Sequence, residues 1–344
     1  MNKSQQRRFS NYRLLSTKLA SFNDQGLAEL IQAASGLGTS IGGSSFMLKI
    51  DNLPIFIKKI KLSSLESTPE NFKSTKNIFQ LPLYYQYGVG SAGFGAWREL
   101  AAHRTTTNWV LAGECLNFPL LFHYRILPSA KHTPTDDELI KIESDVKYWN
   151  NSPAIRSRLL ARLKATTDIV LFLEYFPSNL YDWYGNQLKH GDFVTSSSMI
   201  GDELVKTITY MKAHGLFHMD AHFWNILTDG DHIYFSDFGL ALSSSFELSE
   251  PEISFFNKHH NYDYYSGVTN FLHCIITSLF GHEAWISRLK ECIQAKTKLP
   301  SILQSIVERY APVALIMDDF YNKLRFESKE VPIPIDKLNA LNLF

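Results

Sequence analysis

The sequence predicts an α+β fold made of two parts, and three observations support this prediction. The chain has 344 residues, which at roughly 150 residues per domain allows about two structural units. Short apolar segments bounded by turn residues, which predict strands, occur mainly in the first half, whereas amphipathic segments that predict helices fill the second half. With 45% hydrophobic and 20% charged residues, the composition is that of an ordinary globular protein.

Charge, cysteine content and hydropathy exclude several classes of protein. Lysine plus arginine equals aspartate plus glutamate, at 34 each, so the net charge favours neither a nucleic-acid partner nor a membrane partner. Three scattered cysteines form no disulfide framework or metal-spaced pair and favour a reducing compartment. No apolar signal core follows the basic N-terminus, and the longest apolar run, Phe271–Phe280, is too short to span a bilayer. We therefore expect a cytoplasmic protein, with delivery elsewhere by a signal that is not evident in the sequence as the alternative.

Residues 1–30 are predicted to be an N-terminal extension. Residues 1–23 are polar and basic with only a weak helical pattern, which is typical of a solvated tail. Within them, the Arg-Arg-Phe-Ser segment at 7–10 resembles a site that basic-directed kinases modify, which is the alternative interpretation. Residues 27–34 are predicted to form a short helix or a first strand.

A glycine-rich segment at residues 36–44 precedes two predicted strands, at 46–50 and 55–60, which are separated by a turn. A glycine-rich turn lets backbone N–H groups approach phosphates without obstruction by a Cβ atom. The candidate phosphate-binding glycines are Gly36, Gly38, Gly42 and Gly43.

A second glycine-rich segment, residues 88–95, matches G-x-G-x-x-G and precedes a helix predicted to begin at Ala96. Taken alone, this pattern would indicate a dinucleotide site, but no acidic residue follows at the expected distance in a later strand. We therefore predict a flexible lead-in to the helix, with contact to phosphate or substrate as the alternative.

Residues 129–167 form a charged insert between strands predicted at 118–127 and 168–173. Two amphipathic helices are predicted in the insert, at 136–149 and 154–165, and the second is basic. We expect a solvated helical hairpin. A surface that docks a partner or contacts phosphate is the alternative.

The remaining part of the chain is predominantly helical. The helix predicted at 199–214 ends before Gly215, which is a natural C-cap. Further helices are predicted at 261–281, 283–296, 299–310 and 313–324. A proline-containing tail follows.

Two short motifs carry the chemistry of the chain. The first is His218–Asn225, and the second is the Asp-Phe-Gly tripeptide that begins at Asp237. Between them, the segments 226–228 and 232–236 predict two short strands joined by a turn. Asn225 and Asp237 would then lie at adjacent strand ends, where an amide oxygen and a carboxylate could hold one Mg²⁺ ion.

Together these motifs resemble the catalytic loop and the metal loop of the protein-kinase-like superfamily, which includes protein kinases and related small-molecule phosphotransferases. The resemblance implies ATP and Mg²⁺ as cofactors. It also implies a two-lobed fold, with a small lobe of antiparallel sheet and one helix over residues 31–175. A mostly helical large lobe would cover 176–325, and a tail would cover 326–344.

The resemblance also assigns roles to single residues. Asp220 would orient and deprotonate the acceptor hydroxyl, and Asn225 and Asp237 would bind Mg²⁺. Lys58 would neutralise the ATP phosphates, because Ile-Phe-Ile-Lys resembles the Val-Ala-Ile-Lys pattern of kinases. The adjacent Lys59 is the alternative, on the opposite face of the strand.

Other expected roles concern the surroundings of these residues. Glu99 would hold Lys58 through an ion pair, with Glu66 and Glu70 as alternatives. Backbone groups of Glu174 and Phe176 would bind the adenine edge at the hinge between the lobes.

Two further residues are expected to support the catalytic loop. His218 would brace this loop, and Asp263 would either accept N–H bonds from it or cap a helix.

Several residues depart from the pattern of protein kinases. His222 occupies the position where protein kinases usually have a lysine, and in this it resembles aminoglycoside and choline kinases. Met219 replaces the arginine that would pair with a phosphorylated activation loop, and the segment 239–263 is short for a peptide-binding platform.

Three hypotheses follow from these motifs and departures. The first is a serine/threonine protein kinase-like phosphotransferase, and the second is a small-molecule hydroxyl kinase. The third is a catalytically inactive scaffold that binds partners through residues 129–167.

Overall fold

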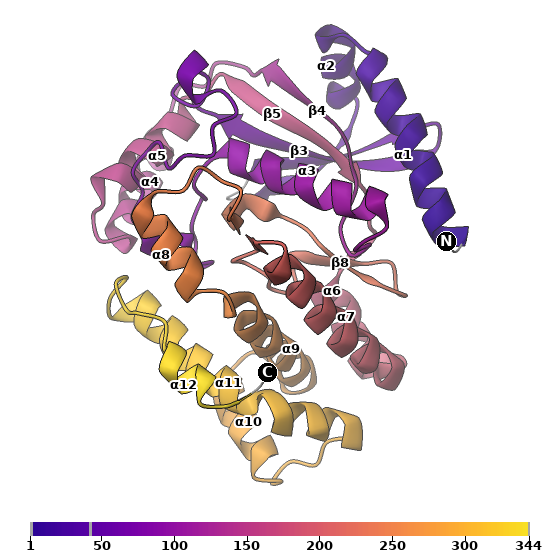
Figure 1. The fold of residues 1–344 in the computed structure, drawn as a ribbon, viewed down its shortest axis with the longest axis vertical. Coiled ribbons are helices and arrows are strands. Elements are labelled where there is room, and N and C mark those ends of the chain that lie inside the picture. The colour runs from indigo at the N-terminus through magenta and orange to yellow at the C-terminus, as the bar shows by residue number, and fades with distance from the viewer. Residues whose placement is uncertain (1–2, 41–42, 343–344) are drawn as a thin grey trace. The chain divides into compact units, whose positions relative to one another are not determined.

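The computed structural model describes residues 3–40 and 43–342 of the chain, and these form a mixed α+β structure (Figure 1). The predicted α+β class is therefore confirmed. The chain divides into two compact units. Unit 1 comprises Met1–Tyr175, Asp237–Ala241 and Ser245–Glu252, and unit 2 comprises Phe176–Ser236, Leu242–Ser244 and Ile253–Phe344.

Unit 1 contains an antiparallel sheet whose strands follow the order β1-β2-β3-β5-β4. Its strands are β1 (Ser35–Ser40), β2 (Gly43–Ile50), β3 (Leu53–Leu62), β4 (Leu121–Pro128) and β5 (Thr167–Glu174). Its helices are α1 (Lys3–Ser21), α2 (Asp24–Gln32), α3 (Ala96–Ala112), α4 (Asp136–Tyr148) and α5 (Pro153–Leu163). Short 3₁₀ turns at Pro69–Asn71 and Leu83–Gln86 lie in the long connection between β3 and α3.

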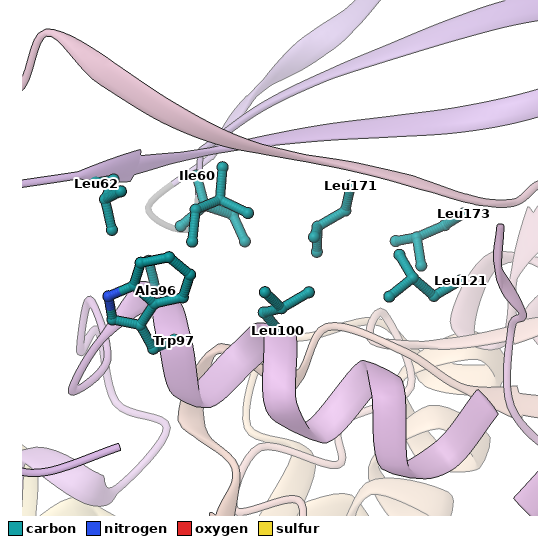
Figure 2. Close-up of a cluster of buried hydrophobic side chains, with 9 residues drawn as sticks. Ile60, Leu62, Ala96, Trp97, Leu100, Leu121, Leu171 and Leu173 are labelled. Atoms are coloured by element: carbon teal, nitrogen blue, oxygen red, sulfur yellow. The ribbon is translucent and has the colours of Figure 1, made fainter. Parts of the chain in front are cut away.

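Helix α3 packs across one face of this sheet and forms a hydrophobic core with it (Figures 1 and 2). The core residues are Ile60, Leu62, Ala96, Trp97, Leu100, Leu121, Ile169, Leu171 and Leu173. Alternate side chains of a strand point to opposite faces, so Lys58 shares the α3 face of β3 with Ile60 and Leu62. The strand register therefore directs Lys58 toward α3.

The expectation that the N-terminal residues form a solvated tail is wrong. Residues 3–21 form helix α1. Leu15 and Leu19 are buried, and Arg8 forms an ion pair of 2.7 Å with Glu174 at the end of β5. The Arg8 guanidinium also donates to the carbonyls of Leu116 and Phe118. These partners are distant in sequence, which explains why the weak local pattern did not predict the packing of α1.

Two other sequence predictions for unit 1 need correction. Gly36 and Gly38 belong to strand β1 and not to a turn, whereas Gly42 lies outside the described residues. The insert is a helical hairpin, α4 and α5, as predicted, but it is not simply solvated: Trp149 and Arg158 are buried. The insert therefore contributes to the interior of unit 1.

Unit 2 is mostly helical. Its helices are α6 (Leu180–His190), α7 (Phe193–Ala213), α9 (Tyr262–Phe280), α10 (Trp285–Ile293), α11 (Ser301–Phe326) and α12 (Ile335–Asn339), and α8 (Glu250–Lys258) runs from unit 1 into it. Strands β6 (Ser178–Asn179), β8 (Ile226–Thr228) and β9 (Ile233–Phe235) form a small sheet, and β7 (Leu216–Phe217) pairs with β10 (Leu242–Ser243). Over residues 3–40 and 43–342, no helix has the length and apolar character needed to cross a membrane.

The C-terminal region differs from the prediction at two places. The helices predicted at 299–310 and 313–324 form a single helix, α11, with Pro312 inside it. The predicted tail contains helix α12, and Leu338 of this helix is buried. The buried residues of α11 include Val307, Tyr310 and Ala314, so packing on both sides of Pro312 offsets the lost backbone hydrogen bond.

A core substitution on α3 tests this packing. Leu100→Ala should lower the free energy of unfolding by about 2–5 kcal/mol, because it removes buried methyl groups and leaves a cavity between α3 and the sheet. Leu139→Ala is the matched control, because Leu139 is exposed on α4, and it should change stability by less than about 0.5 kcal/mol. Urea denaturation followed by circular dichroism measures both values, and equal midpoints would contradict the packing of α3.

Candidate functional site

In unit 1, Lys58 is held between two carboxylates. Its Nζ atom lies 2.6 Å from Glu99 Oε1 and 2.8 Å from Asp237 Oδ1. The predicted ion pair between Lys58 and Glu99 is therefore confirmed. The adjacent Lys59 does not share this position, since its ammonium lies over the ring of Phe46, 5.2 Å from the centroid.

The charges of this cluster stabilise one another. Burial disfavours the charge on Lys58, but the carboxylates of Asp237 and Glu99 outweigh burial and raise the pKa of the lysine above 10.5. Burial also raises the pKa of the Glu99 carboxyl, an effect that Lys58 opposes and Asp237 reinforces. The lysine therefore stays protonated, and its charge allows the two acids to lie close together.

The Asp-Phe-Gly segment is fixed by its backbone conformation and by packing in unit 1. Asp237 has a left-handed backbone, with φ of 59°, and its carboxylate accepts the N–H of Gly239 at 3.3 Å. The ring of Phe238 packs edge-on against His103, with centroids 5.0 Å apart. A Cβ atom at Gly93 would lie 2.3 Å from the carbonyl oxygen of Gly239. The second glycine-rich segment thus has a structural role: at Gly93 it lets the backbone approach Asp-Phe-Gly closely.

Glu66, the alternative partner for Lys58, has a different role. Its carboxylate is buried, forms an ion pair of 2.7 Å with Arg158 and accepts the backbone N–H of Ala96 at 2.9 Å. It therefore stabilises the first turn of α3, where a negative charge is favourable. The sequence carries no local signal of this role, because Arg158 lies 92 residues away.

Two other groups of residues predicted to bind nucleotide have structural contacts of their own. Gly43 begins β2, and a Cβ atom there would lie 2.0 Å from the carbonyl oxygen of Lys59, so only glycine fits at this point of the sheet. The backbone N–H of Glu174 donates to the carbonyl of Leu120 at 2.8 Å. This N–H is therefore engaged within unit 1. In unit 2, the ring of Phe176 stacks on the ring of Tyr234.

In unit 2, Asp220 is oriented by Asn225 and lies near His222. The Asn225 amide nitrogen donates to Asp220 Oδ2 at 3.0 Å and to the Asp220 carbonyl at 3.1 Å. His222 Nε2 lies 3.7 Å from the same carboxylate oxygen. The Asp220 side chain is thus fixed while remaining partly exposed to solvent.

His218 braces this loop, as the sequence analysis predicted. The buried ring lies 3.3 Å from the Asp220 N–H through Nδ1 and 2.7 Å from the Ser236 carbonyl through Nε2. A neutral ring that carries its proton on Nε2 satisfies both contacts. His218 thereby joins the loop to the residue that precedes Asp237.

Asp263 anchors the backbone of the same loop. Its two carboxylate oxygens accept the N–H groups of His218 at 2.6 Å and of Met219 at 2.8 Å. Met219 is buried and has a left-handed backbone, with φ of 64°, so these bonds stabilise a conformation that a methionine rarely adopts. The N-cap of α9 is Asn261. Of the two roles predicted for Asp263, the structure therefore has the one directed at the loop.

The donor atoms of Asn225 and Asp237 are chemically suited to Mg²⁺. Because the Asn225 nitrogen donates to Asp220, the amide oxygen is the atom that could face a cation. Carboxylate and amide oxygens suit Mg²⁺, which binds through one or two carboxylates when phosphates supply other ligands. Among the residues that the structure describes, no group of three or more His, Cys, Asp or Glu side chains is arranged to hold a metal ion.

The candidate residues thus form two sets, each within one unit. Unit 1 brings together Lys58, Glu99 and Asp237, and unit 2 brings together Asp220, His222 and Asn225. No protein-family model matches the chain, and no curated protein sequence matches it. The interpretation of the site therefore depends on the geometry and chemistry of these residues.

Replacing Lys58 by a neutral residue tests how much its ion pairs contribute to the stability of the protein. Lys58→Met leaves Glu99 buried near Asp237 without a positive charge, and we expect it to destabilise the protein by about 3–5 kcal/mol at pH 7. In this variant the folded-state pKa of Glu99 rises further above its unfolded value. Glu99 then binds a proton as the pH falls, so the stability deficit should shrink toward acidic pH. Urea denaturation at several pH values measures it.

The matched control is the double variant Lys58→Met/Glu99→Gln, which removes both charges of the pair. It should be more stable than Lys58→Met alone at pH 7, because no uncompensated carboxylate remains buried on α3. A double variant as unstable as the single one would contradict the ion pair as the source of the deficit.

The carboxyl of Asp263 predicts a dependence of stability on pH. Burial raises its pKa from 3.8 to about 6, although the N–H groups of His218 and Met219 oppose this shift. The folded state therefore favours the protonated form, and stability should fall by up to ~3 kcal/mol as the pH rises from about 4 to about 6. The measurement is the difference in unfolding free energy between the wild type and Asp263→Asn, and a difference that stays flat or increases over this range would contradict the prediction.

Proposed function

We propose that this chain is an ATP- and Mg²⁺-dependent phosphotransferase of the protein-kinase-like superfamily, with unit 1 as the small lobe and unit 2 as the large lobe. The observation that supports it most directly is the placement of Lys58 against both Glu99 and Asp237. In kinases, phosphate binding requires an ion pair between a strand lysine and a helix glutamate, with the aspartate of Asp-Phe-Gly close by to bind Mg²⁺. The acceptor is a serine or threonine hydroxyl of a protein.

The residues of unit 1 would act on the phosphates. Lys58 would neutralise phosphate charge, and Glu99 would hold the lysine in position because its own carboxylate is fully buried. Asp237 is the more exposed of the two acids and would bind Mg²⁺ together with Asn225. When bound, Mg²⁺ would supply neutralisation of the charge that develops on the transferred phosphoryl group.

The residues of unit 2 would act on the acceptor. Asp220 would accept the proton of the attacking hydroxyl, and the hydrogen bond from Asn225 keeps its carboxylate oriented for this step. Asp263 and His218 would keep the loop backbone in the conformation that presents Asp220.

A small-molecule hydroxyl is the second candidate acceptor, and two observations favour it. His222 lies 3.7 Å from the Asp220 carboxylate, where a protein kinase would have a lysine. Arg98 of α3 forms a buried ion pair of 2.6 Å with Glu252, so the part of the segment after Asp-Phe-Gly that comprises Ser245–Glu252 is packed within unit 1. A fixed segment is a poor platform for an extended peptide.

Phosphotransfer is tested by incubating the purified chain with γ-labelled ATP and Mg²⁺. Asp220→Ala and Lys58→Ala should each reduce label transfer by about 10²-fold or more, because they remove the general base and a phosphate-binding charge. Lys49→Ala, an exposed lysine on β2, is the matched control and should transfer label at the wild-type rate. Chelation of Mg²⁺ should abolish transfer.

The destination of the label separates the acceptors. Label on the chain itself or on a protein substrate supports the protein kinase-like reaction, and label found only in added small hydroxyl compounds supports the second candidate. If the chain shows no turnover and no nucleotide-dependent thermal shift, both candidate reactions are overturned and an inactive scaffold is favoured.

A further inference from the structure

Unit 1 contains a cavity of about 850 Å³ that none of Lys58, Glu99 and Asp237 lines. Its walls are strands β2 and β3, the second glycine-rich segment, residues 129–132 and the α4–α5 hairpin. Its volume lies in the range of pockets that bind small organic molecules. It is therefore distinct from the Lys58 cluster, although Gly43, one of the glycines predicted to bind phosphate, lies in its lining.

The walls carry more positive than negative charge. Of the lining acids, Asp168 pairs with Lys61 at 3.1 Å. Glu138 pairs with His132. Asp145 is the remaining carboxylate. The cavity is also lined by Lys59, Lys131, Lys141 and Arg162.

Four of the five lining cations are lysines. Within residues 3–40 and 43–342, no carboxylate forms an ion pair with Lys59, Lys131 or Lys141. Burial, together with the nearby positive charge of Arg158, lowers the pKa of Arg162 to about 10, although Tyr85, Glu66 and Glu99 oppose this shift. An anion in the cavity would relieve this repulsion.

The same cavity offers apolar and aromatic surface. Its apolar and aromatic lining residues include Phe46, Ile142, Tyr148, Trp149, Leu159 and Leu163. Tyr148 and Trp149 lie edge to face, with centroids 5.2 Å apart. Such a wall binds the flat or aliphatic body of a ligand, whereas inorganic phosphate would leave it unused.

We propose that this cavity binds a small organic phosphate monoester, with its phosphate on the lysines and Arg162 and its apolar body against α4 and α5. The five lysine and arginine side chains of the lining exceed its three carboxylates by two, which matches a dianion, and guanidinium and ammonium groups are the usual partners of phosphate. Lys59, the neighbour that points away from Lys58, thereby has a role of its own in ligand binding.

The proposal is tested by calorimetric titration of the full chain with phenyl phosphate, the probe for a phosphate on an aromatic body. We expect one saturable site with at least tenfold higher affinity for phenyl phosphate than for inorganic phosphate or benzoate. Lys141→Glu should weaken binding at least tenfold and Lys59→Ala several-fold, because each removes a lining cation. Lys49→Ala is the matched control and should bind like the wild type.

Competition identifies the site. A saturating non-hydrolysable ATP analogue should leave the affinity for phenyl phosphate unchanged. Displacement by the analogue, combined with loss of binding in Lys58→Met but not in Lys141→Glu, would assign the phosphate to Lys58 and overturn the proposal. No measurable binding, or benzoate binding as tight as that of phenyl phosphate, would overturn it as well.

Discussion

The position of helix α3 depends on buried charge. The ion pairs are Lys58–Glu99, Arg98–Glu252 and Arg158–Glu66. Removing either partner of such a pair leaves a buried charge without compensation, which costs several kcal/mol. Arg98 pairs with Glu252, which follows the Asp-Phe-Gly segment. The adjacent Glu99 pairs with Lys58 of β3. A rotation of α3 would break both pairs at once, so the helix is restricted to one orientation within unit 1.

Buried carboxylates and close backbone contacts also fix the loops of the two units. In unit 1, Gly93 lets one loop pack on the carbonyl of Gly239, and Glu66 accepts the first N–H of α3. In unit 2, Asp263 takes the corresponding role by accepting two N–H groups of the loop that carries Asp220. In each unit a buried carboxylate satisfies backbone donors that would otherwise be unpaired, and the desolvation of that carboxylate is the cost of a fixed loop.

Sequence reasoning predicted the parts of this arrangement that have local signals. The α+β class, the strand with Lys58, the helix with Glu99 and the short strand pair before Asp237 all follow from spacing and periodicity. It did not predict the packing of α1, because Arg8 and its partner Glu174 are 166 residues apart. Nor did it predict the burial of Arg158. A basic helix that covers the interior of a unit has the same local pattern as a solvated helix, and only its distant partner distinguishes the two.

The two acids that contact Lys58 differ in a way that bears on the proposed chemistry. The Glu99 side chain is 4% exposed, whereas that of Asp237 is 37% exposed. A buried carboxylate cannot leave its cation without a large desolvation cost, but a partly exposed one can exchange partners because water stabilises it during the exchange. In the proposed enzyme, Asp237 would give up Lys58 for a metal ion, while Glu99 would keep the lysine in place. In the proposed enzyme, this difference in burial would therefore give Glu99 the role of positioning Lys58 and Asp237 the role of binding the metal ion.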